Sequence, residues 1–224
     1  MNKIYQFVVV FVLMCNIETI DAQKTSNHLM PVGGNYDVYD YSFEYSSKVR
    51  KVLFNGLTDR PEIRFQVMPS FTPENVLDIE HDRDSNRYYI IYHICEQMIW
   101  SNKNWEKVKV NRFKSEIDHE SVKLIKSLFE TATAQTRYPE RTFGPDGSEI
   151  ITVGFDGENY YFSVFISGYG IRSGTVWSPT KGTKMEKLVA IGNKLIELAK
   201  SEKEMVTIDR DLRKSIENLI NELK

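Results

Sequence analysis

Alternating hydrophobic and polar residues predict a β-sheet in the first half of the chain. The run EIRFQVM at 62–68 suits a strand that Pro69 ends, and in NVLDIEHD at 75–82 the acidic residues fall on the face opposite the apolar ones. RYYIIYHIC at 87–95, rich in β-branched and aromatic residues on both faces, is expected to pair with 75–82. A further strand is predicted for Trp105–Phe113.

A period of 3.6 residues predicts helices in the second half. The first follows Asp118, a suitable N-cap, and the next begins with a capping box in which Thr183 pairs with Glu186. A last amphipathic helix is expected at 207–223.

A second hairpin is expected between the first two helices. Its predicted strands are EIITVGF at 149–155 and YYFSVFIS at 160–167, joined by a DGEN turn. The glycine-rich stretch after it, 168–182, is interpreted as a mobile connection whose glycines make bends. The repeated order of hairpin and helix raises the hypothesis of two duplicated halves, 62–136 and 148–201.

These elements predict an α+β fold. An antiparallel sheet built from hairpins would carry helices packed on one face, followed by the C-terminal helix. Residues 48–224 are expected to form a single domain, and 23–47 an irregular leader with an edge strand near 39–45.

The first 22 residues have the layout of a secretory signal peptide. Lys3 gives a positive start, and the apolar run at 7–15 is too short to span a bilayer. Cleavage after Ala22 would give a secreted or periplasmic protein. Lipidation of Cys15 is the alternative, although Met14 is larger than the residue expected before a lipidated cysteine.

Composition narrows the class of partner. Removing residues 1–22 leaves 28 basic and 29 acidic residues, so nothing in the balance attracts nucleic acid or an anionic membrane, and no membrane insertion is expected. Cys95 would then be the only cysteine, which excludes an intramolecular disulfide, and it is expected in a strand. No cofactor motif is present.

The stretch DIEHDRDSN at 78–86 resembles a metal-binding or catalytic site more than any other stretch of the chain. An EF-type calcium loop starting at Asp82 fails because Arg87 replaces the required glycine and His93 the bidentate glutamate, so a hairpin tip is expected. Glu80 and Asp82 are retained as candidate acids for a secreted hydrolase, and His81 with His93 as an alternative metal pair.

Tyr169, Arg172 and Trp177 are the candidate binding residues. They are residue types that concentrate at binding hot spots, and they lie on or beside the glycine-rich segment. The alternative is that Trp177 is a packing residue.

Four stretches together resemble a group of secreted proteins from Gram-negative bacteria that carry no assigned activity: PSFTPENVLDIE, YYIIYHICEQMIW, VGFDGENYYFSVF and SGTVWSPTKGTKMEKLVAIGNKLIELA. The resemblance covers roughly 60–200. It implies export and the two-half layout, and it supplies no functional residues.

The sequence therefore favours an exported, non-catalytic protein-interaction module, such as an inhibitor, immunity-like or accessory factor. A secreted hydrolase with paired carboxylates and a small-molecule carrier remain as alternatives.

Overall fold

A computed structural model describes residues 27–32, 41–138, 143–148, 156–201 and 203–224. Contacts divide the chain into a main unit, 25–140 with 156–224, and a second unit, 1–24 with 141–155. The second unit is described at 143–148, where the carboxylate of Asp146 accepts hydrogen bonds from the backbone and hydroxyl of Ser148. The predicted signal peptide and the predicted strand at 149–155 lie outside the described residues.

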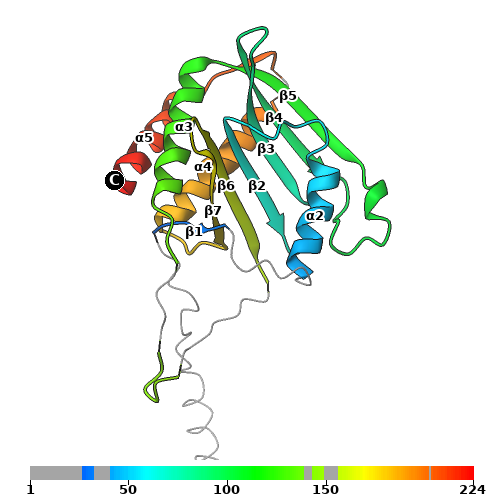
Figure 1. Ribbon diagram of the computed structural model, residues 1–224. Helices are drawn as coiled ribbons and strands as arrows, with labels where there is room; N and C mark the ends of the chain where they lie inside the picture. The colour runs from blue at the N-terminus through cyan, green and yellow to red at the C-terminus, as the bar shows by residue number, and fades with distance from the viewer. Residues whose placement is uncertain (1–26, 33–40, 139–142, 149–155, 202) are drawn as a thin grey trace, which may run out of the picture. The chain divides into compact units, whose positions relative to one another are not determined.

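The main unit contains an eight-stranded sheet (Figure 1). Its spatial order is β1-β7-β6-β2-β3-β4-β5-β8, and neighbours are antiparallel except β5 and β8. The strands are β1 (Met30–Pro31), β2 (Ile63–Pro69), β3 (Asn75–Asp82), β4 (Arg87–Cys95), β5 (Val110–Ile117), β6 (Glu158–Ile166), β7 (Gly170–Trp177) and β8 (Met205–Val206). The α+β prediction and the hairpin at 75–95 are confirmed.

Three helices cover one face of this sheet: α3 (His119–Ala134), α4 (Lys184–Ala199) and α5 (Arg210–Leu223). Both predicted N-caps form, because Asp118 accepts from the backbone N–H of Ser121 at 2.9 Å and Thr183 from that of Glu186 at 3.2 Å. Side chains from β2, β3, β4 and β6 meet the helices in one large hydrophobic core. Figure 1 shows these helices grouped on the side of the sheet away from α2.

A helix that the sequence did not predict, α2 (Tyr41–Leu53), packs on the opposite face. The predicted edge strand at 39–45 is therefore wrong from Tyr41 onward. Serines and aromatic residues gave this segment the composition of a loop, but Tyr45, Val49 and Leu53 recur at helical spacing and face a second apolar cluster. The edge strand of the former leader is β1, which pairs with β7.

Two other boundaries differ from the prediction. Residues Trp105–Lys107 form a 3-10 turn, η1, and the strand begins only at Val110. The glycine-rich stretch from Gly170 is strand β7 rather than a mobile connection. Gly168 and Gly170, with φ of 83° and 87°, make the turn that joins β7 to β6, so the expected bends are confirmed at those positions.

The core between sheet and helices is tightly packed at Gly192 on α4. A Cβ atom added there would lie 2.5 Å from the aromatic ring of Phe65, which comes from the central strand β2. At this point of the core there is no space for a ligand, which the carrier hypothesis would need.

Replacing Gly192 with alanine should lower the free energy of unfolding by about 1–3 kcal/mol, because the Phe65 ring must move in a close-packed core. Urea unfolding measures the change. The matched control is Asn193→Ala, an exposed position on the same helix, which should be near neutral. Equal stability of Gly192→Ala and wild type would contradict the packing described.

Candidate interaction surface

A buried ion pair lies beneath α2. Arg64 on β2 and Asp78 on β3 are directly opposite each other, and the guanidinium donates to both carboxylate oxygens at 2.8 and 2.6 Å. Asp78 is fully buried, and burial raises its pKa to about 6 although the hydrogen bonds and charge of Arg64 act to lower it. Asp78 belongs to the predicted polar face of 75–82, yet it is a buried structural residue because its cross-strand neighbour is an arginine.

Arg64 also joins the sheet to the segment after α2. Its guanidinium donates to the backbone carbonyl of Thr58 at 2.8 Å and lies 4.2 Å from the centre of the Phe54 ring. The backbone N–H of Thr58 in turn donates to Glu80 at 2.7 Å. These contacts hold the C-terminal end of α2 against the sheet.

His93 and Glu74 fix the rest of α2. His93 on β4 is buried, its Nδ1 donates to the carbonyl of Leu53 at 2.8 Å, and burial lowers its pKa. Glu74 is fully buried and accepts from the Tyr45 hydroxyl at 2.6 Å and from the backbone N–H groups of Ile99 and Trp100. One carboxylate therefore ties α2 to the loop that carries Trp100.

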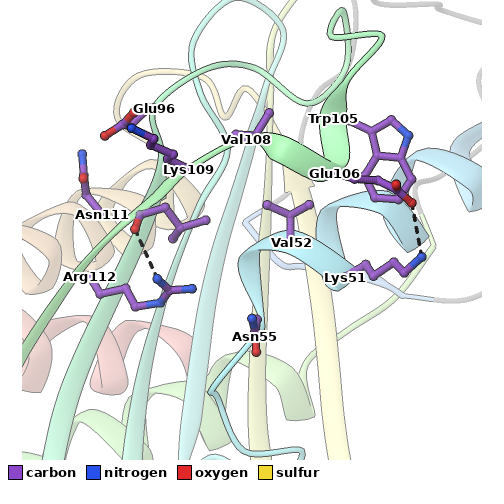
Figure 2. Close-up of a pocket in the computed structure, with 11 residues that line it drawn as sticks. Lys51, Val52, Asn55, Glu96, Trp105, Glu106, Val108, Lys109, Asn111 and Arg112 are labelled. Atoms are coloured by element: carbon purple, nitrogen blue, oxygen red, sulfur yellow. Dashed lines mark hydrogen bonds and ion pairs between the residues drawn. The ribbon is translucent and has the colours of Figure 1, made fainter.

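A groove of about 470 Å³ lies between α2 and β5 (Figure 2). We call it the α2–β5 groove. Its lining residues are Lys51, Val52, Asn55, Glu96, Trp105, Glu106, Val108, Lys109, Val110, Asn111 and Arg112. Lys51 forms an ion pair with Glu106 at 3.6 Å and lies 5.4 Å from the centre of the Trp105 ring. The groove thus combines apolar valines with an aromatic ring and charged side chains.

The outer edge of β5 is unpaired along most of its length within the described chain. β8 pairs only with Glu116 and Ile117, and the N–H of Glu116 donates outward to Glu204. Because the direction of backbone groups alternates along a strand, the N–H groups of Arg112 and Lys114 also point outward. The other edge of β5 is fully used by β4.

The structure does not bring the predicted binding residues together. Tyr169 is 84% exposed at the β6–β7 turn, whereas Trp177 is at the far end of β7. Arg172 and Trp177 are five positions apart on β7, so their side chains lie on opposite faces of the sheet. Trp177 packs against Gly157, where an added Cβ would be 2.6 Å from its ring. Trp177 therefore lies in a closely packed environment, as expected for a packing residue.

The two histidines of the first hairpin are also separated, and the candidate acid Asp82 is engaged in local hydrogen bonds. Asp82 accepts from Ser85 and from the backbone of Asp84 at the hairpin tip, and these hydrogen bonds lower its pKa, which does not suit a general acid. His81 lies opposite Tyr88 and His93 opposite Val76, near the two ends of the hairpin. The metal pair is therefore wrong, and no cluster of metal-binding side chains occurs among the described residues.

Comparison of the chain with protein-family models, curated proteins and solved structures finds no match. The resemblance to secreted proteins of Gram-negative bacteria stays a prediction. Within the described ranges, no helix has the length and apolar character needed to cross a membrane.

Sequence reasoning missed the α2–β5 groove. Its components come from a helix that looked like a loop and from a turn, η1, that looked like a strand. The usable signal was the short stripe of Tyr45, Val49 and Leu53.

Replacing Arg64 with methionine should destabilise the protein by about 3–5 kcal/mol at pH 8, because Asp78 would remain buried as an unpaired charge. The folded-state pKa of Asp78 is about 6 against an ordinary 3.8, so folded protein holds the proton more firmly and stability from this group falls as pH rises. Removing Arg64 raises the folded-state pKa of Asp78 further, so the decrease in stability with rising pH continues above pH 6. The loss should therefore be smaller at pH 5.

Urea unfolding at pH 5 and pH 8 measures both effects. Arg60→Met, which removes an exposed arginine from the same connection, is the control. An identical loss for Arg64→Met at the two pH values would contradict the buried carboxylate.

Proposed function

We propose that this chain is an exported, non-catalytic protein-interaction module that binds its partner across the α2–β5 groove. The observation that carries the proposal is the unpaired edge of β5 beside a groove with aromatic and basic side chains. An open strand edge offers backbone hydrogen bonds to another chain, and tryptophan and arginine are enriched among residues that dominate binding energy.

The loop carrying Trp100 adds an aromatic side chain beside α2, the helix that forms one side of this groove. Trp100 is 49% exposed and packs edge-on against Tyr45, at a ring-centre distance of 4.8 Å. The buried carboxylate of Glu74 holds the backbone of this loop in place. A tryptophan on a fixed loop loses little conformational entropy on binding, which favours affinity.

Export is the part of the proposal that rests on the sequence alone. It requires cleavage near Ala22, and mass spectrometry of the secreted product should find Gln23 as the N-terminal residue. A product that begins at an acylated Cys15 would replace the simple signal peptide with a lipid anchor.

Affinity capture tests the interaction surface. Wild-type chain beginning at Gln23 is immobilised, exposed to periplasmic and culture fractions, and eluted in steps of salt. A stoichiometric partner should be retained, and Trp100→Ala should weaken its binding at least tenfold, or about 1.4 kcal/mol. Urea unfolding of each variant separates lost binding from lost folding.

The matched control is Tyr169→Ala, which removes a more exposed aromatic residue from the β6–β7 turn. It should bind like wild type. Loss of the partner in Tyr169→Ala with retention in Trp100→Ala would move the interaction surface to the other hairpin and refute this placement.

A further inference from the structure

We propose that the outer edge of β5, from Val110 to Lys114, binds an extended acidic segment of the partner by strand addition. This inference rests on the proposed interaction function and specifies the partner's chemistry. In such complexes the backbone hydrogen bonds provide affinity, and alternate side chains provide specificity.

The free backbone groups have the spacing that a new strand needs. The outward N–H groups of Arg112 and Lys114 are two residues apart, as in a regular sheet ladder. Within the described ranges, the carbonyl of Val110 accepts only a long hydrogen bond of 3.4 Å from the Arg112 side chain. A partner strand can therefore pair here without disturbing the hydrogen bonds between β5 and β4.

The charges along this edge favour an acidic segment. Arg112 and Lys114 form no ion pair with a carboxylate among the described residues, and the Lys114 ammonium lies 4.0 Å from the centre of the Tyr89 ring. Among the nearby acidic side chains, Glu116 is already paired with Arg87 at 3.1 Å, and Asp82 is close enough for the charge of Lys114 to help lower its pKa without forming an ion pair. Cross-strand neighbours are about 4.5–5.5 Å apart at Cβ, so carboxylates opposite Arg112 and Lys114 would be within reach.

The same charges disfavour a second copy of this chain as the occupant. Two-fold antiparallel pairing of β5 edges, centred on Arg112 or on Phe113, places Arg112 opposite itself or opposite Lys114. Like charges directly opposite each other destabilise a sheet. A shift toward Glu116 is blocked because β8 occupies the edge at that point.

The α2–β5 groove predicts one further position of the segment. Val110 lines the groove together with Val52 and Val108, so the partner residue opposite Val110 would contact apolar side chains. The preferred segment therefore has an apolar residue and then two acidic residues at alternate positions, opposite Val110, Arg112 and Lys114. The intervening residues face the other side of the sheet.

Hydrogen exchange with a defined peptide tests strand addition. The probe is a capped peptide of alternating threonine and glutamate with valine at either end, and its matched control has glutamine in place of glutamate. The glutamate peptide should bind at least tenfold more tightly at low salt. It should protect the amides of Arg112 and Lys114 from exchange at least tenfold, with little change at Asn111 and Phe113, which already face β4.

Charge reversal provides an independent test. Arg112→Glu combined with Lys114→Glu should lose the acidic peptide and bind a lysine version instead. The control is Lys123→Glu with Lys214→Glu, which makes the same change of net charge on exposed helical positions and should bind like wild type. Circular dichroism checks that each variant is folded.

Several results would overturn the inference. Two of them concern the peptide: it does not bind, or it binds without protecting the amides of Arg112 and Lys114. The others are binding of anionic phospholipid vesicles as tight as that of the glutamate peptide, and a wild-type dimer that the charge reversal dissociates. Partner capture that depends on Trp100, together with absent peptide binding, would overturn strand addition while the interaction function stands. Peptide binding together with unaltered partner capture by Trp100→Ala would overturn the placement of the interaction surface at Trp100, while strand addition stands.

Discussion

The central strands of the sheet are buried on both faces, and the rest of the architecture follows from this constraint. On β2 the side chains of Ile63, Phe65 and Val67 face α3, α4 and α5, while Arg64 and Met68 lie on the other side and are also buried. A strand with two buried faces needs cover on both sides. Three helices supply one cover, and the shorter α2 supplies part of the other.

Because α2 covers only part of the second face of the sheet, it determines where the candidate site lies. α2 is held by buried polar groups, namely Asp78 through Arg64, His93 through Leu53, and Glu74 through Tyr45. It leaves β5 with a groove on one side and an unpaired edge. The same polar contacts that anchor α2 therefore define the shape of the interaction surface, although none of them is exposed.

Local sequence patterns were sufficient to predict an element wherever its hydrophobic periodicity runs along the whole element. The first hairpin, the caps at Asp118 and Thr183, and the three helices behind the sheet follow from alternation, helical spacing and capping chemistry. The α2 helix was missed because its apolar stripe is narrow. The burial of Asp78 was not predicted, because it depends on Arg64, a residue on another strand that local periodicity does not pair with it. The open edge of β5 depends on sheet order, which no local pattern contains.

Cys95 gains a distinct role from its position under α2. It is the sole cysteine in the described part of the chain, it is 2% exposed, and burial followed by the charge of Glu74 raises its pKa to about 12. A thiol of this kind stays protonated and shielded, so it resists oxidation and exchange with foreign disulfides even where the surroundings are oxidising. The rate at which reagents modify the Cys95 thiol therefore reports how often α2 separates from the sheet.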